Sequence, residues 1–137
     1  MATTANGVIT ATELTGSASG GTRLEGANLI GSLGDFTNTN GNFLLTNHQA
    51  LTVSGTVNAG TNVLTLQTTS GDLVVDGALD AGTMTLGSSQ GEVYGTGDIT
   101  THVLNVTADS GITLTGPNDI YRIGTNSPGT GPDTINQ

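Results

Sequence analysis

Cysteine, lysine and tryptophan are absent from this sequence of 137 residues, and aromatic residues are scarce, with two tyrosines and two phenylalanines. Without cysteine, the chain can form neither a disulfide framework nor a thiolate metal site. No stretch approaches the roughly 18 consecutive apolar residues of a membrane span, so we expect no membrane insertion. The opening MATTANGVIT has neither the basic nor the apolar region of an export signal.

Positive charge is nearly missing as well. Eleven carboxylates stand against two arginines, Arg23 and Arg122, and the formal net charge is -9 at pH 7. Such a chain repels nucleic acid and anionic lipid, and it has no basic patch with interleaved aromatic residues. We therefore expect no nucleic-acid partner.

Glycine and threonine are abundant instead, with 22 glycines and 26 threonines. This composition is rich in turn formers and β-branched residues and poor in helix formers. In the stretch NVLTLQTTSGDLVVDGALDAGTMTL, residues 62–86, apolar and polar residues alternate over three to five positions and then meet a glycine. Such short alternating segments predict strands with one buried face.

Comparison of the sequence with itself reveals three ladders of apolar residues spaced by 20 to 22 positions. The first is Phe43/Leu45, Leu64/Leu66, Met84/Leu86 and Leu104/Val106, the second is Leu51/Val53, Leu73/Val75 and Val93/Gly95, and the third is Val57, Leu79 and Ile99. Glycines expected to supply the positive φ of sharp corners lie between them, at Gly55, Gly77 and Gly97 and at Gly71, Gly91 and Gly111. Three strands and three corners make one coil, so the sequence predicts an all-β fold, a right-handed parallel β-helix of about six coils with roughly 20 residues each.

A second, longer repeat is superimposed on the repeat of about 20 residues. Residues 7–34 align without gaps on residues 97–124 at an offset of 90. The aligned pairs include Ile9 with Ile99, Leu14 with Leu104, and Asn28 with Asn118. The longer unit comprises several coils, and it is incomplete at both ends of the chain. Incomplete units would leave strand edges unpaired, so we expect self-association by head-to-tail stacking of copies into dimers or filaments.

The C-terminal residues TNSPGTGPDTINQ lose the alternation and contain two of the three prolines. Because proline cannot donate a ladder hydrogen bond, the β-helix is expected to span residues 1–125. Residues 126–137 are then a tail or linker.

The carboxylates Asp72, Asp76 and Asp80 raise the question of a metal or acid–base site. Such a site needs several carboxylates that converge across neighbouring coils. The spacing instead places Asp80 one coil from Asn58 and from Thr100, so the columns do not converge. We interpret the three as a solvated negative edge, with a weak divalent-cation site as the alternative.

The histidines and arginines have no pattern typical of a catalytic site. His48 and His102 lie more than two coils apart and lack a serine or carboxylate at a recurring spacing, so both are expected to be surface residues. Arg23 and Arg122 are expected to pair with the local carboxylates Glu25 and Asp119, and such surface pairs stabilise little.

Asn28, Asn58 and Asn118 fall at corners. Asparagine tolerates the left-handed conformation there, and amides can stack from coil to coil, so we expect a structural role for all three. No catalytic, cofactor-binding or metal-ligating residue is assigned in this sequence.

The threonines favour one alternative function. Pairs such as Thr83 and Thr85 resemble the outward Thr-x-Thr rows of ice-binding β-solenoids, which need the same pair in successive coils. Below this pair the spacing places Val63 and Thr65, so the row is broken. A threonine-faced ice- or carbohydrate-binding β-solenoid therefore remains the second interpretation, and a polysaccharide-acting enzyme is the third.

The segments LEGANLIGSLGDF, ALTVSGTVNAG, DLVVDGALDAGTMTL and GDITTHVLNVTADSGITLTG resemble the shaft repeats of filamentous-haemagglutinin-like adhesins, the exoproteins of bacterial two-partner secretion. The resemblance covers residues 7 to about 124 and lies in the pattern of the repeat rather than in a catalytic motif. It implies a structural shaft module on the cell surface or secreted, without enzymatic activity or cofactors, in a protein that contacts host cells or other bacteria. The Asn-Pro-Asn-Gly motif of the family's secretion domain does not occur, so the chain matches a shaft segment exported by a signal that it does not contain.

Overall fold

The computed structural model describes residues 3–5 and 7–137, and within them it contains β-strands and no helix. The bounds of the strands are β1 Thr3–Ala5, β2 Thr10–Ala18, β3 Thr22–Asn38, β4 Phe43–Asn47, β5 Leu51–Val53, β6 Thr56–Asn58, β7 Val63–Thr68, β8 Leu73–Val75, β9 Ala78–Ser88, β10 Val93–Gly95, β11 Asp98–Ala108, β12 Ile112–Leu114, β13 Asp119–Ser127 and β14 Asp133–Ile135. In this described part of the chain, nothing helical could reach across a membrane.

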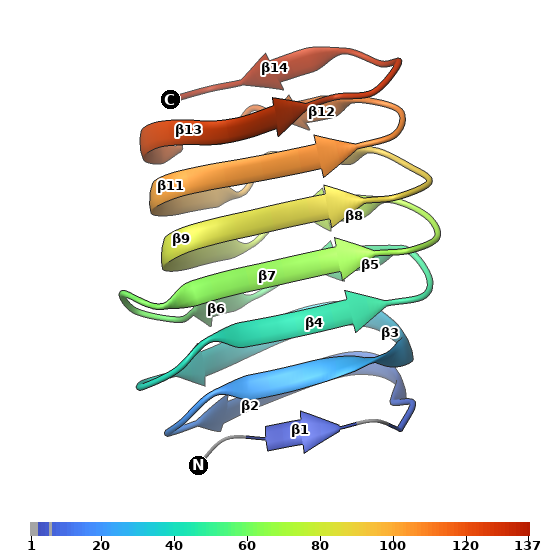
Figure 1. The fold of residues 1–137 in the computed structure, drawn as a ribbon, viewed down its shortest axis with the longest axis vertical. Helices are drawn as coiled ribbons and strands as arrows, with labels where there is room; N and C mark the ends of the chain where they lie inside the picture. The colour runs from blue at the N-terminus through green and yellow to red at the C-terminus, as the bar shows by residue number, and fades with distance from the viewer. Residues whose placement is uncertain (1–2, 6) are drawn as a thin grey trace.

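The strands stack in parallel into one solenoid, as the sequence predicts (Figure 1). Each strand pairs with the strand one coil away, and paired residues are 19 positions apart at Thr3 and Thr22 and 22 apart at Leu51 and Leu73. In Figure 1 the near strands run from left to right and the chain returns behind them as it rises. The winding is therefore right-handed, with about six turns of roughly 20 residues.

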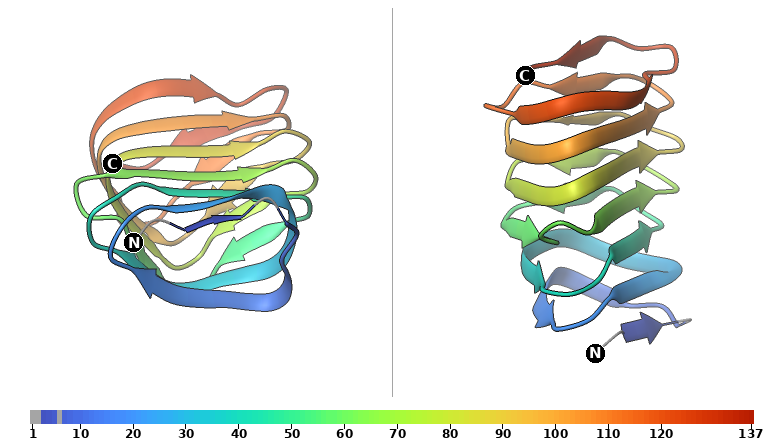
Figure 2. Two further views of the ribbon diagram at one scale, coloured as in Figure 1. Left: turned by 60° about the horizontal axis from the view of Figure 1, so that its bottom comes forward. Right: turned by 60° about the vertical axis from the view of Figure 1, so that its left-hand side comes forward.

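Three ladders of strands form the walls of the solenoid, which Figure 2 shows from two further sides. Long strands such as β3, β9 and β11 bend at a corner and so contribute to two ladders. Face A consists of β1, residues 22–28 of β3, β4, β7, residues 83–88 of β9, residues 103–108 of β11 and residues 122–127 of β13. Face B consists of residues 13–14 of β2, residues 32–33 of β3, β5, β8, β10, β12 and β14. Face C consists of residues 16–17 of β2, residues 36–37 of β3, β6, residues 78–81 of β9, residues 98–101 of β11 and residues 119–120 of β13.

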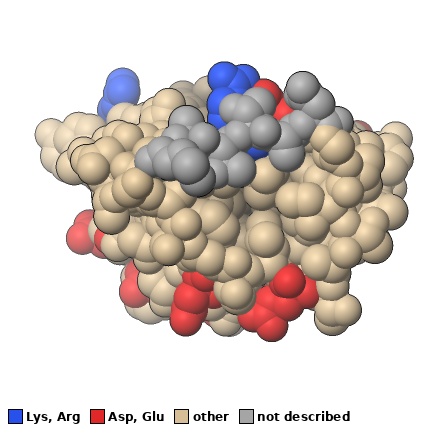
Figure 3. Space-filling model, turned by 90° about the horizontal axis from the view of Figure 1, so that it is seen from below, with Lys and Arg blue, Asp and Glu red and all other residues tan. Residues whose placement is uncertain are grey.

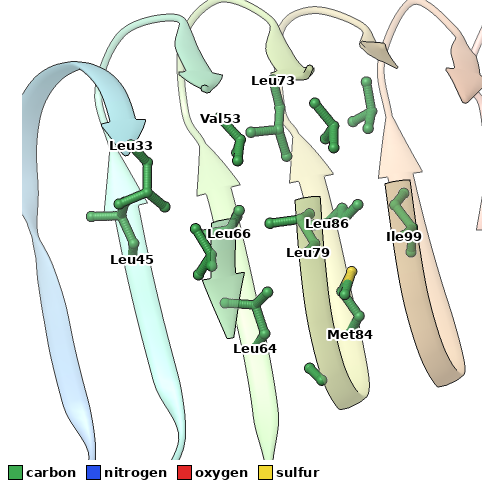
Figure 4. Close-up of a cluster of buried hydrophobic side chains, with 14 of the residues drawn as sticks. Leu33, Leu45, Val53, Leu64, Leu66, Leu73, Leu79, Met84, Leu86 and Ile99 are labelled. Atoms are coloured by element: carbon green, nitrogen blue, oxygen red, sulfur yellow. The ribbon is translucent and has the colours of Figure 1, made fainter. Parts of the chain in front are cut away.

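Columns of aliphatic side chains fill the interior, in the register that the ladders predict (Figure 4). Leu45, Leu66, Leu86 and Val106 stack on one another through four successive coils, and each is 0% exposed. Full burial of one such side chain stabilises the fold by about 1.5 to 3 kcal/mol. The outward residues between them are polar or half-buried, which accounts for the alternation in the sequence.

The corner glycines are required for two different physical reasons. Gly71 and Gly111 have φ of +85° and +140°, as expected for sharp corners. The prediction is wrong for Gly91 and for Gly55, Gly77 and Gly97, which do not have positive φ. A Cβ on Gly77 would instead collide with the carbonyl oxygen of Gly55, and one on Gly97 with that of Gly77. At this corner, glycine is needed because successive coils approach too closely for a side chain.

The β-helix continues past its predicted boundary. β13 extends through Ser127, and β14 pairs in parallel with β12, so much of the expected tail at residues 126–137 belongs to the last coil. Pro128 and Pro132 flank the turn between these strands, where no ladder hydrogen bond needs the missing N–H. The carbonyl oxygen of Pro132 still accepts a hydrogen bond from the backbone N–H of Ile112 at 2.7 Å.

Candidate functional site

The carboxylates singled out in the sequence are not gathered into a site. Asp80 lies between Asn58 and Thr100 in the ladder of face C, in the predicted register. Asp76 is exposed at the corner beyond face B. Within residues 3–5 and 7–137, no three histidine, aspartate or glutamate side chains lie close enough together to hold a metal ion.

Two carboxylates connect one coil to the next, a role that sequence reasoning missed. Asp35 Oδ1 accepts a hydrogen bond from the backbone N–H of Thr56, and Asp72 Oδ1 accepts one from that of Glu92, both at 2.8 Å. The donors lie 21 and 20 positions further along the chain, which is one coil. These side chains therefore take the place of ladder hydrogen bonds at the corners.

Both histidines are exposed, and each contacts a residue one coil away. His48 Nδ1 lies 2.7 Å from Thr69 Oγ1. The ring of His102 stacks on Tyr121, with ring centroids 4.5 Å apart and planes 8° from parallel. The sequence did not reveal this stack because the coil-to-coil offset at that position is 19, whereas the apolar ladders suggested 20 to 22.

The two arginines behave differently from each other. Arg23 pairs with Glu25 at 2.7 Å, as predicted, and both side chains are substantially exposed. The prediction that Arg122 pairs with Asp119 is wrong, since the described part of the chain gives Arg122 no ion pair. The reason is that Asp119 lies on face C, whereas Arg122 lies beyond the corner on face A.

Charge is distributed unevenly around the solenoid. Face A carries both arginines, Arg23 near its N-terminal end and Arg122 near its C-terminal end, and among the carboxylates only Glu25. The other ten carboxylates lie on faces B and C or in the turns. Figure 3, viewed from the N-terminal end, shows the arginines on one side and most of the visible carboxylates on the other.

The centre of face A is uncharged but does not form a regular threonine lattice. Thr65 and Thr85 stack on each other in β7 and β9. Val63 pairs with Thr83, so the predicted break in the row is present, and the column of Thr65 and Thr85 continues with Leu44 on one side and Asn105 on the other. The central side chains of this face are half-buried, and their hydroxyl groups do not repeat from coil to coil.

The asparagines are structural, although not by the expected conformation. Among the residues described, no residue other than glycine has positive φ, so the expected left-handed asparagines are not found. The buried amide of Asn28 instead bonds backbone groups. Its Oδ1 accepts from Ile9 N at 2.8 Å, and its Nδ2 donates to the carbonyls of Leu24 at 3.0 Å and Thr46 at 2.9 Å.

Asn118 repeats this arrangement at the offset of 90. Its Oδ1 accepts from Ile99 N at 3.0 Å, and its Nδ2 donates to the carbonyls of Leu114 at 3.3 Å and Asn136 at 3.0 Å. Each of these partners lies 90 positions beyond the corresponding partner of Asn28. The 90-residue alignment in the sequence therefore corresponds to a repeated set of hydrogen bonds.

A shallow hollow of about 280 Å³ lies on face B, and sequence reasoning missed it. The hollow is lined by Glu92, Tyr94, Gly95, Thr96, Thr113 and Thr115. Tyr94 is 36% exposed and presents an aromatic side chain among the threonine hydroxyls and the Glu92 carboxylate. An aromatic face with hydroxyls and a carboxylate can contact the apolar face and the hydroxyls of a sugar ring. The lining comes from two coils, so no local motif could have indicated it.

Comparisons with family models, with curated proteins and with solved structures find no match to this chain.

Proposed function

We propose that this chain is a structural shaft module of a bacterial surface or secreted adhesin, outside the cell and without enzymatic activity. The observation that carries the proposal is the continuity of the solenoid. Parallel pairing runs without interruption from β1 to β14, and one cluster of buried aliphatic side chains extends through the coils. In solenoids each coil contacts only its neighbours, so length can be added by repetition without a change of fold.

Two further observations support a structural role. The repeat resembles adhesin shafts over residues 7 to about 124, and such shafts place binding regions at a distance from the cell. The chain also repeats its own hydrogen bonds at Asn28 and Asn118, which is typical of a unit used in tandem. Contacts with host or bacterial surfaces would then belong to regions that the shaft carries.

End-to-end stacking of copies is part of this proposal. The strands β13 and β14 are the first and the last in the order of paired strands. Each therefore has one edge without a partner strand in the described chain. Unpaired edges of a parallel sheet offer backbone donors and acceptors to another coil. A second copy could therefore extend the shaft.

The shaft role can be tested by displaying the chain on a bacterial surface with a fluorescent tag at its C-terminal end. A second chain would contain an additional copy of residues 48–137 after Gln137, which preserves the 90-residue repeat. At about 4.8 Å per coil, the tag should stand roughly 20 Å further from the membrane, measured by energy transfer to a membrane dye. A matched insertion of a flexible Gly/Ser linker of equal length should give a broad distribution of heights. Equal, narrow heights for the single and the extended chain would contradict the proposal.

Binding of a saccharide in the hollow around Tyr94 is the second candidate function, and the hollow itself is the observation that favours it. A soluble glycan screen should then give a ligand whose binding is lost in Tyr94→Ala. Tyr121→Ala, which removes an exposed tyrosine outside the hollow, should bind normally. If no glycan binds, or both variants weaken binding equally, this candidate fails.

A further inference from the structure

The two ends of the chain are copies of one structural unit. The pairs β1–β3, β2–β3 and β3–β4 recur as β10–β12, β11–β13 and β12–β14, with the partners displaced by 90 positions. The ladder register shifts just after Leu14 in the first copy and just after Leu104 in the second. The same unit is thus seen twice, once covered by a further coil and once at the C-terminal edge.

One contact differs between the two copies. In the first copy Phe36 and Phe43 meet edge to face, with ring centroids 4.8 Å apart, beneath the coil that contains β6 and β7. The equivalent positions of the second copy are Asn126 and Asp133. Asn126 Nδ2 donates to both carboxylate oxygens of Asp133, at 3.0 and 2.8 Å. A buried aromatic pair is therefore replaced by an exposed polar pair where no coil follows in the structure.

The polar pair also terminates two columns of the core. Asn126 ends the column of Leu24, Leu45, Leu66, Leu86 and Val106, and Asp133 ends the column of Leu51, Leu73, Val93 and Ile112. Neighbouring positions remain apolar, since Ile123 and Ile135 stand where the first copy has Leu33 and Leu45. The polarity is thus confined to two columns that are aliphatic in the preceding coils.

We propose that Asn126 and Asp133 form a polar plug across the C-terminal end of the core, and that this plug opposes the stacking of a second copy of this chain there. The inference rests on the proposed shaft function and concerns how strongly shafts join. The unpaired backbone edges of β13 and β14 favour a second copy, and the polar pair weakens that contact. A second copy that stacked on this end would take the Asp133 carboxylate out of water. Removing a carboxylate from water without a cationic partner is strongly unfavourable. Neither arginine is available beside it, since both lie on face A, whereas Asp133 lies on face B.

The plug can be tested with the double variant Asn126→Leu/Asp133→Leu, which continues both aliphatic columns to the end of the shaft. Light scattering after size exclusion over a range of concentrations would measure self-association, and negative-stain microscopy would measure particle length. We expect the variant to associate at a concentration at least about tenfold lower than the natural chain. The particles should be rods lengthened along the shaft axis.

The matched control is Asn40→Leu/Asp109→Leu, which makes the same chemical changes at exposed turn positions. This control should associate like the natural chain. Equal association of both double variants would overturn the plug, because loss of charge or added surface leucine would then account for the effect. A folded Asn126→Leu/Asp133→Leu variant that associates no more than the natural chain would overturn it as well. Asp133→Asn, which keeps a polar pair and removes the charge, should promote association less than the double variant.

The plug and the shaft proposal can fail separately. The display experiment extends the chain covalently, and it is run with Asn126→Leu/Asp133→Leu in both displayed chains, so its result depends neither on association between copies nor on the polar pair. Unchanged association of the plug variant together with the expected gain in height would overturn only the plug.

Discussion

At the scale of single residues, buried asparagines connect coils along the axis. The Asn28 side chain bonds the backbone of Ile9 in the preceding coil and of Thr46 in the following one, while also bonding Leu24 in its own coil. A side chain that satisfies three backbone groups in a dry interior is difficult to replace, because each group left unpaired is unfavourable.

The variant Asn28→Ala should therefore be strongly destabilised. Loss of the amide leaves the N–H of Ile9 and the carbonyls of Leu24 and Thr46 without this partner, and we expect the free energy of unfolding to fall by about 2 to 4 kcal/mol. Urea unfolding followed by circular dichroism measures this change. Asn40→Ala, at an exposed turn, should change the stability by less than about 0.5 kcal/mol. Similar losses in the two variants would show that the buried hydrogen bonds are not responsible.

The sequence predicted that Asn28 and Asn118 share a role, but not how they perform it. The 90-residue alignment paired them because the apolar residues and glycines around them match. Their partners are backbone groups of other coils, and a backbone group has no signature in the sequence. The expectation of a left-handed corner followed from local propensity, which the tertiary hydrogen bonds override.

At the scale of the strand, alternation decides which side chain enters the core. In β7, Leu66 is 0% exposed and lies between Leu45 and Leu86 in its column, whereas Thr65 points outward on face A. The two residues are neighbours in the chain, but their side chains point to opposite sides of the strand.

Truncation of these two residues should accordingly have different effects. Leu66→Ala should lower the free energy of unfolding by about 2 to 5 kcal/mol, since it opens a cavity within a closed column. Thr65→Ala, in the same strand, should lower it by less than about 1 kcal/mol. Chemical denaturation of both variants under identical conditions measures the difference. A larger loss of stability for Thr65→Ala would show that the Thr65 side chain, and not that of Leu66, points into the core.

Strand registers were predictable where the aliphatic ladders are unbroken, between Phe43 and Val106. Near the C-terminal end the spacing between paired residues of successive coils falls to 19, and so the contact of His102 with Tyr121 was missed. The last coil was missed for a different reason. Its prolines lie beside a turn rather than in a ladder, and Asp133 occupies a column position that is aliphatic in the four preceding coils.

At the scale of the whole molecule, a formal net charge of -9 governs how copies meet. Like charges on two chains repel over a distance set by the Debye length, which is about 10 Å at 0.1 M salt and about 3 Å at 1 M. Screening should therefore favour contacts between copies, while the uncharged core that stabilises each coil changes little.

Raising the salt concentration should increase the average mass of the natural chain in solution. Light scattering at low and at high sodium chloride, with the protein concentration fixed, measures this change. The far-ultraviolet circular dichroism spectrum should remain constant and so serves as the control for folding. A mass that falls with salt would instead indicate association through opposite charges.

The 90-residue unit does not contain a whole number of turns. Its first copy begins on face A with β1, and its second begins on face B with β10, because 90 residues at roughly 20 per turn complete about four and a half turns. Corresponding loops of the two copies therefore project from different sides of the solenoid. In a shaft built from such units in tandem, as proposed above, variants of one loop would lie in two rows along the axis, so a receptor or antibody that approached from either side would meet only every second variant.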